Sequence, residues 1–178
     1  MTERTPVLER LPGEMTLRRP TVSDHPRLLA ALADWWGGQG GAAGVLQRQL
    51  LLPRLFLQHF ADTSYLVERA DGTVHAFLIG FLSQSDPGTA YIHFIAVSPD
   101  GRGDGWARGL YRRYFAMARD LGRNRVRCIT SPANRTSIAF HTRLGFRMEP
   151  GDRLDSDIPV HSDYDGPGLD RVSFVRDL

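Results

Sequence analysis

The sequence predicts a single α/β domain built on a mixed, mostly antiparallel sheet. Three apolar runs with strand character follow one another, separated by the turn formers Asp-Gly and Ser-Asp-Pro-Gly, at residues 64–68, 73–82 and 91–97. A helical apolar pattern over residues 106–121 then leads to a further strand at residues 125–130. Because a strand, a helix and a strand of these lengths form a right-handed crossover, this last pair of strands is expected to be parallel.

The N-terminal third is expected to supply an arm, a strand and two helices. Residues 1–13 are predicted as a flexible arm that precedes a domain of residues 14–178, and Pro20 ends a first short strand. Two helices follow, separated by a glycine-rich loop and with a break near Pro53 in the second, at residues 27–36, 37–41 and 45–60. The C-terminal part is expected to hold a short helix, a strand, an acidic turn-rich segment and a last strand, at residues 137–144, 146–148, 150–170 and 171–178.

Length and composition are typical of one globular protein of the cytoplasm. The chain has 178 residues, of which 42% are hydrophobic and 24% charged, as in ordinary soluble domains. No apolar run approaches the roughly 20 residues of a membrane helix, and the N-terminus is too charged for a secretory signal. A net charge of +2 is too weak to indicate nucleic-acid binding. All 22 basic residues are arginine, which excludes a lysine Schiff base.

The single cysteine, Cys128, excludes an internal disulfide framework and a cysteine-rich metal site. It lies in a strand-like run, where a buried, inert thiol is expected in preference to a nucleophile. We expect no metal in this protein.

The segment between Val97 and Trp106 has the features of an anion site. Ser-Pro-Asp-Gly ends the preceding strand, and Arg-Gly-Asp-Gly at residues 102–105 leads into the next helix. The first N–H groups of a helix lack intrahelical partners, and the helix dipole adds about half a positive charge there. Glycines let the backbone approach a phosphate closely. A plain strand-to-helix turn is the alternative reading.

The spacing of this segment is more specific than a lone glycine-rich loop. Val97-x-Pro99-x-x-Arg102-Gly103-x-Gly105-x-Ala107-x-x-Leu110 resembles the acetyl-coenzyme A pyrophosphate motif of the GNAT superfamily of N-acetyltransferases. Residues 134–146 (NRTSIAFHTRLGF) resemble the family's other signature, in which an asparagine precedes a short helix that ends in aromatic–Tyr–x–x–Leu–Gly–Phe. The two motifs occur in the family's order, one helix and one strand apart.

The resemblance implies a GNAT-like fold and acetyl-coenzyme A (acetyl-CoA) as cosubstrate. In the family the central sheet has about seven strands, its fourth and fifth strands are splayed, and helices cover both faces. The pantetheine arm lies in the gap and bonds to fourth-strand backbone. The cofactor contacts implied here are Ile95, Ala96, Val97, Arg102, Gly103, Asp104, Gly105, Trp106, Ala107 and Asn134. Arg102 can add a side-chain charge contact, and capping is the alternative role for Asn134.

Two of the predicted catalytic residues depart from the family pattern. His141 stands where the family has the tyrosine that protonates the departing thiolate, and Tyr91 where many relatives have a glutamate. His93 lies on the same strand face as Tyr91, and we predict it as the base, because an ammonium must lose a proton before it attacks the thioester. A packed, hydrogen-bonded histidine at position 93 and a helix-end histidine at position 141 are the alternatives.

The acceptor pocket is expected to come from the variable segments. Trp35 and Trp36 are predicted as one wall, and the acidic loop as another, through Asp163 and its neighbours Asp155, Asp157 and Asp165. Aromatic rings and carboxylates suit a cationic amine, although a solvated loop is the alternative for most of these acids. Trp106, which replaces a compact aliphatic residue, is expected to pack on either the core or the cofactor.

Together these features predict an N-acetyltransferase that transfers an acetyl group from acetyl-CoA to a primary amine of a small molecule or peptide by direct attack on the thioester. A catalytically silent coenzyme A-binding sensor or interaction domain is the alternative, because the usual glutamate and tyrosine are absent. Nucleotide binding fits poorly, since the loop has no GK[ST]. The family commonly forms homodimers, so a second copy of the chain is a candidate partner.

Overall fold

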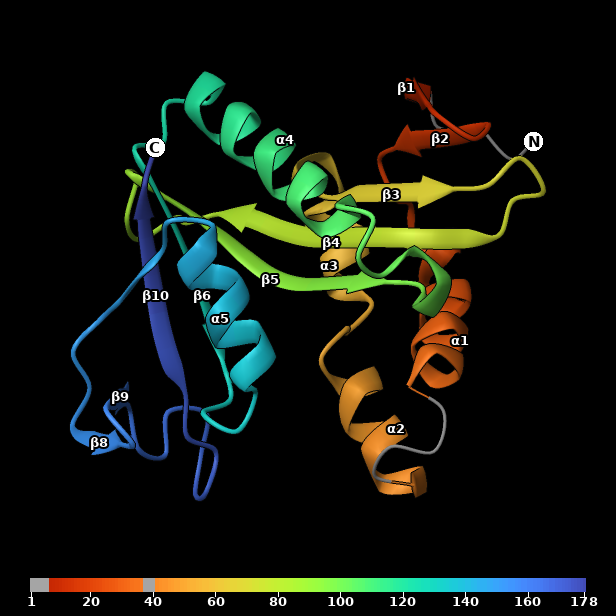
Figure 1. Cartoon of the computed structure of the whole chain (residues 1–178). Coiled ribbons are helices and arrows are strands. Elements are labelled where there is room, and N and C mark those ends of the chain that lie inside the picture. Colours follow the sequence, from red (N-terminus) through yellow and green to blue (C-terminus); the bar gives the residue numbers. More distant parts are fainter. Residues whose placement is uncertain (1–6, 37–40) are drawn as a thin grey trace. The chain divides into compact units, whose positions relative to one another are not determined.

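The computed structural model describes residues 7–36 and 41–178, which divide into two compact units (Figure 1). The first unit comprises Met1–Phe81 and Phe94–Tyr114, and the second comprises Leu82–His93 and Phe115–Leu178. Strand β5 (Thr89–Val97) and helix α4 (Trp106–Asp120) therefore contribute residues to both units.

The first unit holds the N-terminal strands and helices. Its elements in chain order are β1 (Val7–Leu11), β2 (Met15–Arg18), η1 (Val22–Asp24), α1 (His25–Trp35), α2 (Gly41–Leu50), α3 (Leu55–His59), η2 (Ala61–Thr63), β3 (Tyr65–Glu68), β4 (Val74–Leu82) and η3 (Pro99–Gly101). Strands β1 to β4 pair antiparallel in sequence order. The break between the two helices near Pro53 is confirmed.

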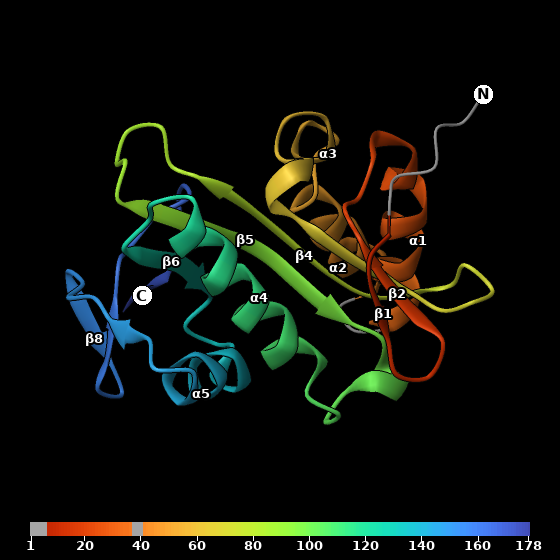
Figure 2. The same cartoon turned by 90° about the horizontal axis from the view of Figure 1, so that it is seen from above.

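Strand β4 forms the centre of the first unit because both of its faces are covered. Trp35 of α1 stacks on Phe77 with ring centroids 6.0 Å apart, and leucines of α1 and α3 pack into the same cluster. On the other face, Tyr114 of α4 closes over Gly80 and donates a hydrogen bond to the carbonyl oxygen of Phe81 at 3.0 Å. Figure 2 shows α1 and α3 on one side of β4 and the start of α4 on the other. Helices on both faces, as predicted, are confirmed.

The second unit holds the crossover strands. Its elements after the first half of β5 and the second half of α4 are β6 (Arg125–Thr130), α5 (Arg135–Arg143), β7 (Arg147–Met148), β8 (Arg153–Asp155), β9 (Ile158–Val160) and β10 (Val172–Asp177). The predicted parallel pairing is confirmed, since β5 and β6 run parallel, with Thr89 opposite Arg125 and Tyr91 opposite Arg127. Strand β10 pairs antiparallel with both β6 and β7.

Along the hydrogen-bonded ladder the strands follow the order β1-β2-β3-β4-β5-β6-β10-β7. This is the mixed, mostly antiparallel sheet that the sequence predicts, with eight strands in place of about seven. The parallel pairing of β5 with β6 covers Thr89 to Tyr91, which is the part of β5 that precedes the predicted cofactor contacts.

Two segments are more regular than the sequence suggests. Val7–Leu11, predicted as part of a flexible arm, is strand β1, because Gly13 and Glu14 take positive φ (72° and 57°) and return the chain to pair with β2. Its apolar residues give no burial signal, since Val7 is 48% exposed. The acidic segment likewise contains the β8–β9 hairpin. Residues 1–6, and 37–40 of the predicted glycine loop, lie outside the described residues.

Candidate active site

The loop between β5 and α4 contains two positions whose backbone conformation favours glycine. The turn η3 is closed by the N–H of Gly101, which donates to the carbonyl oxygen of Ser98 at 3.0 Å. Gly103 and Gly105 then adopt φ values of 96° and 86°, which L side chains rarely take. A Cβ at either position would meet no atom within 4 Å. The backbone of the loop therefore turns sharply and is open to a ligand on the side where side chains would stand.

Helix α4 begins directly after these glycines, at Trp106. Its first N–H groups have no intrahelical acceptor, and its 15 residues give it a full dipole. The N–H of Gly109 donates to the carbonyl oxygen of Gly105 at 2.9 Å, which marks where helical bonding starts. An open glycine backbone followed by a helix N-terminus fits the pyrophosphate of acetyl-CoA, so the residues present suit the cofactor that the motif implies.

The side chain of Arg102 points back toward the end of α1. Its Nη2 donates to the carbonyl oxygen of Trp35 at 3.1 Å, and its guanidinium lies 5.2 Å from the centre of the Trp36 ring. Trp35 itself is 8% exposed and stacked in the core, so only Trp36, half-buried, presents a partly accessible ring there. The structure thus brings the predicted cofactor residue Arg102 together with both predicted acceptor-wall tryptophans, through one carbonyl and one ring face.

Trp106 packs against the protein beneath the loop. Its ring meets that of His75 edge-on, with centroids 4.9 Å apart and an interplanar angle of 81°. His75 comes from β4, is buried, and lies against Ser98 and Gly101 as well. Sequence reasoning missed His75, because one histidine inside a long apolar run looks like any core-strand residue.

Burial along β5 alternates over residues 90–97 as the sequence predicts, except that Phe94 is half-buried. Ala90, Ile92 and Ala96 are buried, whereas the four residues predicted on the other face, Tyr91, His93, Ile95 and Val97, are half-buried. Ile95, Ala96 and Val97 belong to the first unit together with the glycine loop, and Tyr91 and His93 belong to the second. Because the side chain of Ala96 is buried, this residue can contact a ligand only through its backbone.

Tyr91 lies among groups that hold its phenol protonated. Burial is the largest cause of its raised pKa, and the neighbouring Tyr164, Cys128 and Asp165 raise the pKa further. At neutral pH Tyr91 is therefore a hydrogen-bond donor and not a base. His93, two residues further along β5, is half-buried, and its predicted role as the base stays a prediction.

His141 is packed inside the second unit. Its ring stacks on Phe174 with centroids 4.9 Å apart, and Phe146 meets it edge-on. Nδ1 lies 2.8 Å from the carbonyl oxygen of Ser137, which can only accept, so Nδ1 carries the proton. Burial lowers the pKa of His141, and the bond to Ser137 opposes this only in part. A neutral imidazole in these surroundings resembles the packed helix-end alternative; the acid role stays a prediction.

Asn134 caps helix α5. Its Oδ1 accepts a hydrogen bond from the N–H of Ser137 at 3.0 Å, which is the capping role weighed from the sequence. The amide nitrogen takes no part in that bond, so a cofactor contact through this group stays a prediction. Cys128 is buried, and burial raises the pKa of its thiol, as expected of an inert cysteine.

The acids of the segment after β7 hold the segment's own shape. The Oδ1 of Asp163 accepts from the N–H of Gly168 at 2.6 Å, while the N–H of Asp163 donates to Asp170 at 2.9 Å. Asp165 pairs with Arg171 at 2.7 Å, and Asp155 lies 3.8 Å from Arg135. These contacts favour the structural alternative for the acidic loop, although Asp165 also lies near enough to Tyr91 to raise its pKa.

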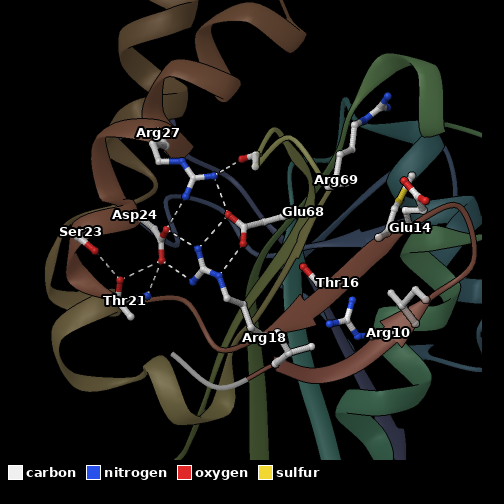
Figure 3. A pocket seen from close by; sticks show the side chains of 15 residues that line it. Arg10, Glu14, Thr16, Arg18, Thr21, Ser23, Asp24, Arg27, Glu68 and Arg69 are labelled. Carbon is white, nitrogen blue, oxygen red and sulfur yellow. Dashed lines mark hydrogen bonds and ion pairs between the residues drawn. The ribbon is translucent and has the colours of Figure 1, made fainter. Parts of the chain in front are cut away.

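A hollow of about 900 Å³ lies elsewhere in the first unit, between the β1–β2 hairpin, η1 and the β3–β4 turn. Figure 3 shows its wall, where Arg18 and Arg27 both reach toward the carboxylates of Asp24 and Glu68. None of the site residues predicted from the sequence lines it. Because both of these acids are matched by arginines, the hollow offers structural ion pairs and no catalytic arrangement.

Neither a metal-binding cluster of side chains nor a membrane-crossing helix is found in the described part of the chain. Residues 7–36 and 41–178 contain no group of three or more histidine, cysteine, aspartate or glutamate side chains that could hold a metal ion. Over the same ranges no helix is both long and apolar enough to cross a membrane.

Comparison with known proteins points to one family. The model of the acetyltransferase (GNAT) family matches residues 27–146, which include the glycine loop and the segment from Asn134 to Phe146. An L-2,4-diaminobutyric acid acetyltransferase of Nocardia farcinica is 30% identical over 93 residues, which are 52% of this chain and 48% of that protein. The chain thus spans about half the length of this relative.

Solved structures share the fold over nearly the whole chain. A GNAT acetyltransferase from Streptococcus pneumoniae superposes with a TM-score of 0.65 at 15% identity, covering 93% of this chain and 100% of that one. The diaminobutyrate acetyltransferase EctA from Paenibacillus lautus, solved with L-2,4-diaminobutyric acid and coenzyme A, gives a TM-score of 0.63 at 20% identity, covering 92% and 94%. At these identities the likeness shows the fold.

Proposed function

Because the chain belongs to the acetyltransferase (GNAT) family, we propose that this enzyme transfers an acetyl group from acetyl-CoA to a primary amine of a small molecule. Family membership makes it an acyltransferase. The observation that supports acetyl-CoA as the cosubstrate is the loop after β5, where Gly103 and Gly105 leave the backbone open beside the N-terminus of α4.

The chemistry requires the ammonium to lose a proton and the departing thiolate to gain one. Acetyl-CoA supplies a thioester whose carbonyl carbon a neutral amine attacks. We assign His93 to take the proton from the ammonium, directly or through water, because it is a half-buried imidazole on the partly accessible face of β5. Tyr91, held as a phenol by burial, is assigned to donate a hydrogen bond to the reacting groups.

The acceptor is proposed to be small and cationic. Two relatives named above are diaminobutyrate acetyltransferases, and one of them was solved with L-2,4-diaminobutyric acid bound. Asp165 and its partner Arg171 both lie near Tyr91, and a carboxylate and a guanidinium together match the ammonium and carboxylate groups of an amino acid. L-2,4-diaminobutyric acid is therefore the first acceptor to test, and polyamines, other amino acids, aminoglycosides and peptides are the comparison set.

Thiol release measures the reaction directly. The purified chain is incubated with acetyl-CoA and each acceptor, and free coenzyme A is quantified over time. Turnover with a small amine supports the proposal, and mass spectrometry of the product identifies the nitrogen acetylated. Coenzyme A binding in calorimetry without turnover on any amine would overturn the acceptor assignment. His93→Ala is expected to lower kcat by about 100-fold, the contribution typical of a general base, and to remove the acidic limb of its pH profile.

A further inference from the structure

The glycine loop rests on the side chain of His75. This residue of β4 is 2% exposed, and its carbonyl oxygen accepts a hydrogen bond from the N–H of Ser98 at 2.8 Å. A Cβ added to Gly101 would fall 2.6 Å from ring atoms Cε1 and Nε2, so that position must be glycine for the turn to close over the ring. The Trp106 ring, which begins α4, meets the same imidazole edge-on. Both ends of the loop therefore contact one histidine.

The partners of His75 fix which nitrogen carries its proton. Nη2 of Arg69 lies 3.0 Å from Nδ1, and a guanidinium can only donate, so Nδ1 is the acceptor. Ser98 Oγ lies 2.9 Å from the same nitrogen. The proton of the neutral ring is then on Nε2, which is buried and has no hydrogen-bond partner among the described residues. An unpaired buried N–H is unfavourable, so the donation from Arg69 to Nδ1 holds the ring in this state.

A second link joins this histidine to the start of the loop. Arg69, at the end of β3, also donates to the carboxylate of Asp100 in η3. Hydrogen bonds from Ser98 and Arg69 hold the pKa of Asp100 below its ordinary value. His75, Arg69, Ser98 and Asp100 therefore form one connected cluster beneath the loop.

We propose that His75 is a positioning residue for the cofactor loop: its neutral imidazole, protonated on Nε2, keeps Arg69, Ser98 and Gly101 where the loop can present its N–H groups to a pyrophosphate. The inference rests on the proposed use of acetyl-CoA. Protonation would place an Nδ1–H against the guanidinium of Arg69, and two cationic donors cannot share that contact. The cluster then opens, and the loop loses its support.

The cluster's charges decide the pH at which this occurs. Burial is the largest cause that lowers the pKa of His75, and Arg69 lowers it further, while Asp100 and Asp104 act in the opposite direction. Because the pKa of His75 lies below the ordinary value of about 6.5, the contacts that support the loop are kept at neutral pH and are lost only in acid. Affinity for coenzyme A should therefore fall as the pH decreases into the acidic range.

The test compares coenzyme A binding by the wild type, His75→Asn and His75→Leu, using calorimetry at about pH 8 and about pH 5.5. The wild type is expected to lose about 10-fold in affinity in acid. Asparagine keeps an acceptor for Arg69 but does not titrate, so His75→Asn should bind as tightly as the wild type at the higher pH and lose the pH dependence. His75→Leu should bind about 10-fold more weakly at both pH values, with the KM for acetyl-CoA raised and kcat retained. His59→Leu, at an exposed histidine of α3, is the matched control.

Nitrogen-15 NMR of the ring gives a readout independent of activity. It should show the Nε2–H tautomer for His75 at neutral pH, and near-ultraviolet circular dichroism should show that each variant is folded. An Nδ1–H tautomer, or a His75→Leu protein that binds coenzyme A like the wild type at both pH values, overturns the inference. If the wild type is active and the His75 variants bind coenzyme A and react as the wild type does, only this inference is wrong. A folded wild type that binds no coenzyme A removes the proposed function as well.

Discussion

The guanidinium of Arg102 donates a hydrogen bond to the carbonyl oxygen of Trp35 at 3.1 Å, which joins the first residue of the glycine segment to the last turn of α1. The last carbonyls of a helix lack intrahelical donors, and a cation is favourable at that end of the dipole. Nε of Arg102 also lies 3.4 Å from the carbonyl oxygen of Val97, so one side chain connects β5, the loop and α1. The loop is thus fixed from α1 as well as from His75.

Replacing Arg102 with glutamine should therefore loosen the loop. We expect the KM for acetyl-CoA to rise about 10-fold, because a hydrogen bond from a charged donor and a cation–π contact are both lost. Arg112→Gln removes an exposed charge from α4 and should leave the KM within about 2-fold. Steady-state kinetics with acetyl-CoA varied would contradict this if both variants had the same KM.

Alanine at Gly103 or Gly105 should weaken cofactor binding beyond its effect on the fold. Each substitution forces a side chain into a positive φ, which costs about 1 kcal/mol, and places a methyl group in the open cradle. Gly122→Ala is the matched control, because its φ is 75° and its Cβ also meets nothing within 4 Å. Urea unfolding should give similar losses for all three, whereas only the loop variants should bind coenzyme A at least about 10-fold more weakly.

Gly80→Ala should destabilise the first unit strongly. The added Cβ would fall 2.4 Å from Cε2 of the Tyr114 ring, which is fully buried and bonded to Phe81. We expect a loss of about 3 kcal/mol in the free energy of unfolding, the upper end for an overpacked core. Tyr114→Leu makes room for the methyl group, so the double variant should be less destabilised than the sum of the two single ones, and additive losses in a double-mutant cycle would refute the steric explanation.

Asp24→Asn should remove acid-sensitive stability. Burial alone would raise the pKa of Asp24, but hydrogen bonds from Arg18 and Thr21 hold it below its ordinary value. The stabilisation is therefore fully present above the unfolded pKa of about 4 and is lost as pH falls through the folded pKa. We expect about 3 kcal/mol lost at neutral pH and a flatter pH dependence, measured by urea unfolding. Asp177→Asn, which breaks the exposed pair with Arg147, should cost under about 0.5 kcal/mol.

His141→Phe tests whether this histidine acts as an acid or as packing. Its lowered pKa means that the unfolded chain takes up a proton near pH 6.5 while the folded chain stays neutral, so stability falls as pH decreases from about 6.5. Phenylalanine should remove that part of the acid loss, since it fills the same space against Phe174. If His141 only packs, kcat should stay within about 3-fold of the wild type, and a 100-fold loss would establish the acid role.

Much of the fold could be predicted because many of its elements are determined by short local segments of the sequence. Alternation in β4 and β5, the turn at Gly72 and the helical face of α4 each follow from one short segment and its periodicity. The hairpin of β1 could not be predicted, because its residues are mostly exposed and its strand character comes from pairing with β2. The β8–β9 hairpin was hidden for the same reason, since composition marks its segment as acidic and turn-rich.

The candidate site divides in a similar way. The loop from Arg102 to Ala107 could be identified from spacing, because glycines and a helix start are local requirements. His75 and Arg69 could not, since their importance arises only when β4 and the end of β3 lie beneath the loop. Side-chain direction could not be predicted either: Arg102 faces α1, and Trp35 enters the core.

Every ion pair described in the structure uses an arginine, and the sequence has no lysine at all. A guanidinium stays charged beyond about pH 12, so these pairs persist in alkaline solution where lysine pairs would begin to titrate. Acceptor amines become nucleophilic under those same conditions, as their ammonium groups lose protons near pH 10. Because no lysine side chain of the enzyme can compete for the acetyl group, assays at high pH should report acceptor chemistry without background from acetylated lysines.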